Sequence, residues 1–194
     1  MRVVIKAVIF DLDGVIIDSN PVIEAFWKSW AGKEGIALTD ALVREWIYGR
    51  KVADTIKGLF DHVPDGRKKE IERAGYAFDS TMQPAPVPGV VGFIRSLTDF
   101  QVSTGVVTSS HHSRMLKMLA DLGIENNFTH FVTADDVTHG KLHPEPYEKM
   151  RENMNLPAEY GLVFEATNSG LQAATATGMY ALVTGNDKPR RASR

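Results

Sequence analysis

Five short apolar runs alternate along this 194-residue chain with stretches of helical spacing. The runs cover 3–10, 102–107, 128–133, 161–164 and 180–183, and the first of them is rich in β-branched residues. Runs of this length are typical of strands buried on both faces of a parallel sheet. Strands that alternate with helices predict βαβ units, and therefore an α/β fold with a Rossmann-like, doubly wound parallel sheet.

The stretches between the runs carry apolar stripes. Met115, Leu116, Leu119 and Leu122 repeat at helical spacing, and Gly123 follows them at a position suited to ending a helix. In doubly wound sheets, ligands bind at the carboxyl ends of the strands, near the point where the strand order reverses. The residues directly after each apolar run are therefore the candidates for a functional site.

Residues of about 20–83 interrupt the alternation and have helical patterns throughout. Asn20 is expected to cap the first helix, and Pro21 suits its first turn. Three further helical patterns cover 41–48, 52–60 and 67–82. Trp27 and Trp30 are expected to pack in the core of this unit rather than to stack on a sugar. Four helices inserted after the first strand predict a small helical bundle over the sheet edge.

A proline-rich segment follows the predicted helices. Residues 84–88 contain three prolines and are followed by Gly89. This density of proline favours a stiff, extended connection and a boundary between structural units. The sequence therefore predicts an α/β core formed by residues 1–17 and 88–194, with a helical cap domain formed by residues 18–87.

The composition excludes several classes of function. The chain has no cysteine, which rules out disulfide scaffolds, thiol nucleophiles and cysteine zinc sites. Its formal net charge of -2 offers no basic surplus for binding nucleic acid. No apolar run reaches the about 18 residues that span a bilayer, and Asp11 comes too early for a signal peptide. We expect a cytoplasmic enzyme or binding module for a small molecule, without nucleic-acid or membrane partners.

Polar residues follow four of the runs, and each has an ordinary structural explanation. Asp11 and Asp13 are also typical of a turn, and the hydroxyl run that begins at Thr108 is typical of a helix cap. Lys141 alone is typical of a solvated charge, and Glu165 of a capping loop. Their order along the chain is a more specific signal than any one of them. Each group follows a predicted strand, and the carboxyl ends of parallel strands meet at one edge of the sheet. We therefore expect these groups to share one site.

This ordered set resembles the motifs of the haloacid dehalogenase superfamily, in particular its β-phosphoglucomutase-like branch with a small α-helical cap. The segment FDLDGV at 10–15, followed by Asp18 and Ser19, is similar to the first motif. The other three motifs are matched by Thr108, by Lys141 with Pro144, and by Glu165 with Gly170. The resemblance covers nearly the whole chain.

Two motifs depart from the family pattern. The third usually reads Lys-Pro-x-Pro-Asp, where residues 141–145 read KLHPE. The fourth commonly reads Glu-Asp-Ser with the aspartate a magnesium ligand, where Glu165 is followed by Ala166. The loss of one carboxylate should weaken Mg²⁺ binding, because hard cations depend on oxygen ligands and their charge. Water in the vacant position, help from Asn168 or Asp136, and feeble catalysis are open alternatives.

The resemblance implies hydrolysis of a phosphate ester through an aspartyl phosphate. It implies that Asp11 is the nucleophile and Asp13 the general acid and base. The phosphate oxygens would be bound by a lysine and two hydroxyl residues, Lys141, Thr108 and Ser109. Mg²⁺ would be held by Asp11, by the backbone carbonyl of Asp13 and by Glu165. Asp13 also argues against a dehalogenase, because a halide leaves without a proton.

Two features of the cap concern the substrate. The loop Gly49-Arg50-Lys51 lies where this family often places a substrate loop, although a solvated basic loop is an equal alternative. Mutases of the family carry a histidine at the position of Ile23. This difference favours a Mg²⁺-dependent phosphatase for a small phosphorylated metabolite, such as a sugar phosphate, over a hexose-phosphate mutase. The third interpretation, because of Ala166, is a catalytically weakened binding protein.

Four histidines lie close to the motifs, namely His111, His112, His139 and His143. They belong to loops without the rigid spacing of metal ligands. We therefore expect that His112 or His143 touches the substrate or coats the entrance of the site, and a histidine metal site is the less favoured alternative.

Overall fold

The computed structural model describes residues 4–184, which contain a five-stranded sheet. The strands are β1 (Ala7–Phe10), β2 (Ser103–Val107), β3 (His130–Val132), β4 (Gly161–Glu165) and β5 (Tyr180–Val183). They lie in the order β3-β2-β1-β4-β5, and every neighbouring pair is parallel. The chain builds outward from β1 on one side and then crosses to the other. The expected doubly wound α/β fold is thereby confirmed.

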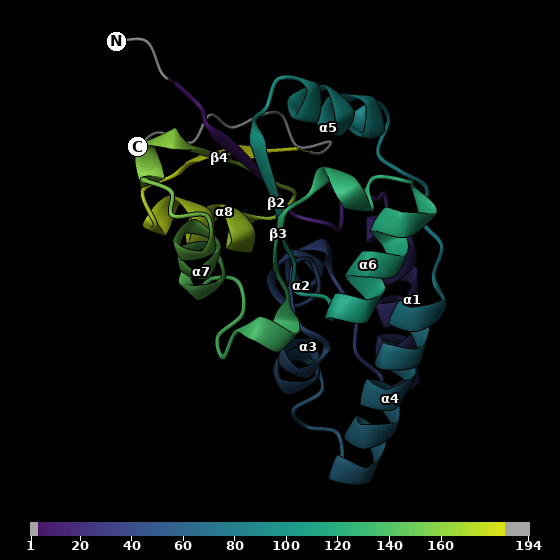
Figure 1. Ribbon diagram of the computed structural model, residues 1–194. Coiled ribbons are helices and arrows are strands. Elements are labelled where there is room, and N and C mark those ends of the chain that lie inside the picture. Colours follow the sequence, from purple (N-terminus) through teal and green to yellow (C-terminus); the bar gives the residue numbers. More distant parts are fainter. Residues whose placement is uncertain (1–3, 185–194) are drawn as a thin grey trace.

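Alternate residues of the central strand feed two cores on the two faces of the sheet. Val8 and Phe10 pack with one core, and Ile9 packs with the other, as the period of two along a strand requires. The first core is covered by α5 (Val90–Asp99) and α6 (His112–Asp121). The second is covered by α7 (Glu145–Asn153) and α8 (Asn168–Ala176). Figure 1 shows these helix pairs on opposite sides of the sheet.

Four helices follow β1 in the chain and precede α5. They are α1 (Asn20–Lys33), α2 (Asp40–Trp46), α3 (Val52–Leu59) and α4 (Asp65–Thr81). They have an apolar core of their own, in which Trp27 is buried and against which the half-buried Trp30 packs. Figure 1 shows them together at one end of the sheet. The boundaries of the core and cap domains stay a prediction, and residues 1–3 and 185–194 lie outside the described residues.

Some element boundaries differ from the expected ones for local reasons. The run at 128–133 gives a shorter strand, because a 3-10 turn (Glu125–Asn127) directly precedes it and Phe128 packs into the core. Helix α6 buries Met118 rather than Leu116, which is 39% exposed. Asn20 does not cap α1, because Ser19 occupies the cap position. The Ser19 hydroxyl donates instead to the carboxylate of Asp13.

The helical insertion is seated on the carboxyl edge of the sheet. Ser109 after β2 donates its hydroxyl to the carbonyl of Gly49 at 2.7 Å. A Cβ on Gly49 would lie only 2.9 Å from the Thr167 hydroxyl, so this close approach requires glycine. Lys51 donates its ammonium to the carbonyls of Ala134 and Val137, each at 3.0 Å. Among the described helices, none is long and apolar enough to cross a bilayer.

Candidate active site

The structure brings three of the expected site residues into one buried cluster. Asp11 directly follows β1, Glu165 ends the neighbouring β4, and Lys141 reaches them from the loop before α7. The Lys141 ammonium lies 2.7 Å from Asp11 Oδ1 and 2.6 Å from Glu165 Oε1. All three residues are at most 2% exposed. The cluster lies where the order of the strands reverses, the usual place for a ligand in this fold.

Several groups besides Lys141 donate hydrogen bonds to the Glu165 carboxylate. Its Oε1 accepts from the Tyr147 hydroxyl, and its Oε2 accepts from the Thr167 hydroxyl at 3.1 Å and the Ala166 amide at 3.1 Å. A Cβ on Gly170 would overlap the Glu165 carboxyl group at 1.9 Å, so the carboxylate packs on bare backbone. Both Glu165 oxygens therefore have donors already, and any metal ion would compete with them.

Asp11 has one satisfied oxygen and one without a partner. Its Oδ1 accepts from the Leu12 amide at 2.8 Å and pairs with Lys141. Its Oδ2 is buried and has no hydrogen-bond partner among the described residues. Burial, with the charge of Glu165, raises the pKa of Asp11 to about 8 against the opposing charge of Lys141. An orphaned, buried carboxylate oxygen is suited to a cation or to the substrate.

Asp13 is held by a buried arginine. Arg114 of α6 donates from Nη1 to Asp13 Oδ2 at 2.8 Å and from Nη2 to Oδ1 at 2.7 Å. Ser19 and Ser110 also donate to this carboxylate. Burial alone would raise the pKa of Asp13, but the charge and hydrogen bonds of Arg114 outweigh it and lower that pKa. Asp13, the expected general acid and base, is therefore present in the site as a carboxylate paired with Arg114.

The sequence interpretation missed Arg114, although its position carried a signal. It belongs to the apolar face of α6 that contains Met115, Met118 and Leu119, and its side chain is only 3% exposed. An arginine on a buried helix face requires an acidic partner, because an unpaired buried charge is costly. Asp13, in the first motif, supplies this partner.

Arg114 also faces an acid of the cap. Its Nε lies 3.7 Å from Asp79 Oδ1 at the end of α4. Burial raises the pKa of Asp79 to about 6, helped by the charge of Asp13 and opposed by those of Arg114 and His111. Arg114 therefore bridges the sheet and the helical insertion.

The Asp79→Asn variant is expected to be more stable than the native chain at pH 8, by up to about 3 kcal/mol. A carboxyl whose pKa rises from 3.8 to about 6 on folding destabilises the fold when ionised. This penalty is absent below pH 3.8, grows as the pH rises, and is complete above about 6. Urea unfolding of both proteins at pH 4 and pH 8 measures it. An equal difference in stability at both pH values would contradict the assignment.

Among the hydroxyl residues after β2, Ser110 donates to the Asp13 carboxylate at 3.2 Å. Thr108 is buried, and its hydroxyl accepts from the Ser110 amide at 3.1 Å. A pocket of about 50 Å³ lies between the sheet and the cap. Residues of both units line it, among them Asp11, Asp13, Ser109, Gly49, Arg50 and Arg114. Lys51 is turned toward main-chain carbonyls instead, so only part of the expected cap loop faces this pocket.

The donor set suits a hydrated Mg²⁺ ion. Asp11 offers its unpartnered Oδ2. Ala166 offers no side-chain oxygen. Asn20 Nδ2 and Ala166 Cβ lie 2.5 and 2.7 Å from the place of a Cβ on Gly14, so the Asn20 amide would have to turn to present its oxygen near Ala166. Amide oxygens are acceptable ligands for hard cations, and Mg²⁺ keeps several waters. Asp136 Oδ2 accepts from the amide and hydroxyl of Thr133, and a role of Asp136 as a ligand stays a prediction.

Leu142 explains the departure in the third motif. Its φ is 101°, in the left-handed region that side chains rarely adopt. Proline fixes φ near -65° and cannot take this conformation. The loop around Lys141 therefore follows a path here that the usual proline would not allow.

None of the four histidines lines the pocket within the described residues. His111 Nδ1 pairs with Asp135 at 2.5 Å, and the His112 amide donates to the same carboxylate at 2.9 Å. His139 and His143 lie together on the loop of Lys141, with ring centroids 4.5 Å apart. The expectation that His112 or His143 touches the substrate or coats the entrance stays a prediction.

Known proteins are similar to this chain in sequence and in fold. The sequence model of the haloacid dehalogenase-like hydrolases matches residues 8–184. The chain belongs to the haloacid dehalogenase-like hydrolase family. It is 30% identical over 180 residues to validoxylamine A 7'-phosphate phosphatase of Streptomyces hygroscopicus subsp. limoneus, with 90% of this chain and 83% of that protein covered. It is 31% identical over 185 residues to glycerol-1-phosphate phosphohydrolase 2 of Saccharomyces cerevisiae, with 90% and 72% covered.

The fold of this chain is also similar to that of solved structures. The solved structure of a putative β-phosphoglucomutase from Bacteroides vulgatus superposes with a TM-score of 0.76 at 27% identity, with 93% of this chain and 75% of that chain covered. The expected resemblance to the β-phosphoglucomutase-like branch of the haloacid dehalogenase-like hydrolases is confirmed.

Proposed function

We propose that the protein is a phosphatase that hydrolyses a small phosphorylated metabolite, such as a sugar phosphate. The observation that carries this proposal is the buried cluster of Asp11, Lys141 and Glu165 at the central strand ends. An acid with one free oxygen beside a fixed ammonium can approach a phosphate group whose charge the ammonium partly neutralises. The named phosphatases among its relatives support the same class of reaction.

In the proposed reaction, an Asp11 carboxylate oxygen attacks phosphorus while the bond from phosphorus to the ester oxygen breaks. Asp13 gives its proton to that departing oxygen. Asp13 then takes a proton from water, whose oxygen attacks the aspartyl phosphate and releases phosphate and free Asp11. Lys141, Thr108 and Ser109 are proposed to bind the phosphate oxygens.

Arg114 sets a condition on this reaction. Asp13 can donate a proton only when it is protonated, and the double hydrogen bond with Arg114 favours its anion. Asp79 is a second acidic partner for Arg114, since its Oδ1 lies 3.7 Å from Arg114 Nε. We propose that a shift of Arg114 toward Asp79 releases Asp13 for proton transfer when substrate is bound.

Asp11 Oδ2, the Asp13 carbonyl and the Asn20 amide oxygen are the proposed ligands of Mg²⁺, with water in the remaining positions. Glu165 joins them only if it gives up some of its present donors. When bound, Mg²⁺ supplies positive charge that reduces the repulsion between Asp11 and the phosphate.

Ile23 supports hydrolysis rather than phosphoryl transfer between sugar hydroxyls. It lines the pocket beside Trp27, and both side chains are apolar. The imidazole that mutases of this branch carry at this position is therefore replaced by an apolar wall.

Phosphate release tests the proposed function directly. The purified chain is expected to release phosphate from p-nitrophenyl phosphate and from members of a panel of sugar and polyol phosphates in the presence of Mg²⁺. A molybdate assay measures the product. A product isomer without free phosphate would favour a mutase, and no turnover of any compound would overturn the proposal.

A catalytically weakened binding protein is the second candidate, and Ala166 is the observation that favours it. The Ala166→Asp variant is expected to lower the Mg²⁺ concentration for half-maximal activity by at least about tenfold, because it adds an oxygen ligand with charge. Ala166→Asn is the matched control, with similar size and no charge. An unchanged Mg²⁺ dependence would contradict this role for position 166. An inactive native chain that Ala166→Asp activates would establish the second candidate.

A further inference from the structure

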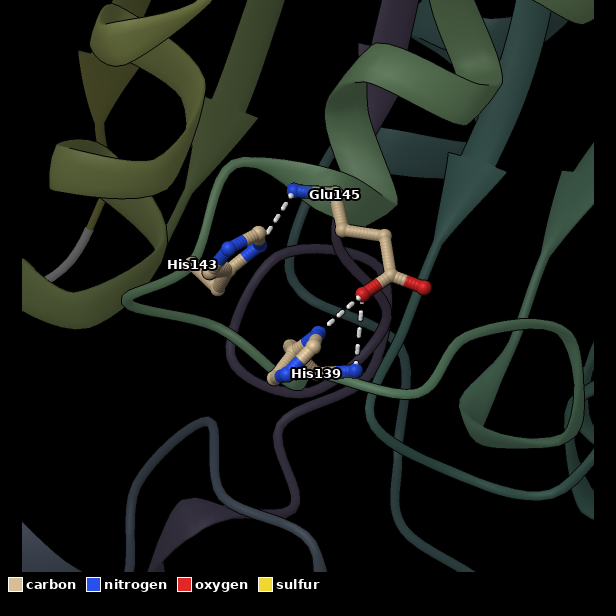
Figure 2. Close-up of side chains that lie close together, drawn as sticks. All are labelled: His139, His143 and Glu145. Carbon is tan, nitrogen blue, oxygen red and sulfur yellow. Dashed lines mark hydrogen bonds and ion pairs between the residues drawn. The ribbon is translucent and has the colours of Figure 1, made fainter.

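A second group of ligating side chains lies on the loop that carries Lys141, outside the pocket. His139, His143 and Glu145 each offer one ligand atom, and the three atoms lie within 4.8 Å of one another. Figure 2 shows the two imidazole rings facing each other, with Glu145 beside them. We propose that these three residues form a binding site for a borderline divalent cation such as Zn²⁺.

Glu145 is fixed in place before any cation arrives. Its Oε1 accepts from the amide of Thr138 at 2.8 Å, and its Oε2 accepts from the amide of His139 at 2.8 Å. Oε2 also lies 2.8 Å from Nδ1 of His139. A carboxylate only accepts, so the proton of this contact belongs to His139 Nδ1, and a cation would take its place between Nδ1 and Oε2. These two ligand atoms therefore lie side by side before an ion binds, and the two amide hydrogen bonds keep Glu145 in position.

His143 is placed to supply the second nitrogen. Its ring stacks on that of His139 with centroids 4.5 Å apart and an angle of 28° between the planes. Its Nδ1 accepts only a long bond of 3.2 Å, from the Glu145 amide. The ring can therefore shift its proton or turn without losing a strong interaction. A shared cation would give a partner to both rings, which otherwise repel each other when protonated.

The ligand types select the kind of metal. Two imidazoles and one carboxylate match the preferences of Zn²⁺, whereas Mg²⁺ prefers an all-oxygen shell and gives up its waters reluctantly. Both histidines are exposed, so water can complete the coordination. The site is therefore distinct in chemistry from the carboxylates around Asp11.

The position of the site gives it a consequence for Lys141. His139 and His143 flank this lysine at equal separation along the chain, and the cap residue Arg50 donates to the Lys141 carbonyl at 3.3 Å. A cation that joins the two histidines would close the loop and fix the backbone from which Lys141 reaches Asp11. The histidines thus have a role that their spacing in sequence did not indicate.

Calorimetric titration of the untagged, full-length chain with Zn²⁺ tests the proposal. The native protein is expected to bind one Zn²⁺ ion in a saturable step that excess Mg²⁺ does not displace. The variant with both His139→Gln and His143→Gln is expected to bind at least about tenfold more weakly. His62→Gln, which changes an exposed histidine of the cap, is the matched control and should bind as the native chain does.

A further variant separates this site from the proposed active site. Asp11→Asn removes a carboxylate from the cluster around Lys141 and should leave Zn²⁺ binding unchanged. Absence of binding to the native chain, or equal affinity in the double histidine variant, would overturn the proposal. Loss of binding in Asp11→Asn would also overturn it, because the ion would then belong to the carboxylates.

Discussion

The Asp11→Asn variant is expected to lose phosphatase activity by at least about a thousandfold. The side-chain amide of asparagine has the size of the carboxylate but is not a nucleophile toward phosphorus, so no aspartyl phosphate forms. Lys141 keeps Glu165 as a partner at 2.6 Å, and the variant should therefore fold. Phosphate release under saturating substrate measures the loss, and circular dichroism checks the fold.

Asp18→Asn is the matched control for this experiment. Asp18 lies in the same segment of the chain, but it is exposed. The same chemical change at this position should leave the rate within twofold of the native value, on the order of the effect of a neutral surface substitution. Equal rates in Asp11→Asn and the native chain would contradict the role of Asp11 and with it the proposed mechanism.

The parallel sheet could be predicted because its signal is local and repeated. Each strand falls within a short apolar run or at its edge, and the polar residues at the strand ends share one edge of the sheet once the strands are parallel. This reasoning predicted that Asp11, Lys141 and Glu165 would share one site, although Lys141 and Asp11 are far apart in sequence. Strand ends were less predictable, since turns such as Glu125–Asn127 depend on packing around Phe128.

The network around Asp13 was not predicted, because it depends on directions of side chains that spacing does not describe. Ser19 has the position of a helix cap but points its hydroxyl at Asp13. Arg114 lies on an apolar helix face and reaches the same carboxylate across the domain. For both side chains, the hydrogen bond to the distant Asp13 carboxylate replaces the role that their position in a helix would indicate. A buried charge within an apolar stripe is the part of this network that a sequence can reveal.

The Arg114→Met variant is expected to unfold more easily by about 3–5 kcal/mol at pH 7, because the Asp13 carboxylate loses its buried counter-charge. Methionine fills much of the same space, so the loss reports mainly the charge. The pKa of Asp13 is lowered from 3.8 in the native chain. The stabilisation is therefore complete above about pH 4 to 5 and is lost as the pH falls through the lower, folded-state pKa. Urea unfolding at pH 7 and at pH 3 measures this change.

Two comparisons separate the charge from general disruption of α6. Arg73→Met changes an exposed arginine of the cap and should alter the free energy of unfolding by at most about 0.5 kcal/mol. The double variant Arg114→Met with Asp13→Asn removes the orphaned charge and should regain most of the lost stability. If the double variant is as unstable as Arg114→Met, the packing of the arginine stem, rather than its pairing with Asp13, stabilises the fold. If the double variant regains stability, the role of the arginine is to control the ionisation state of Asp13. Proton transfer to the departing oxygen depends on that state.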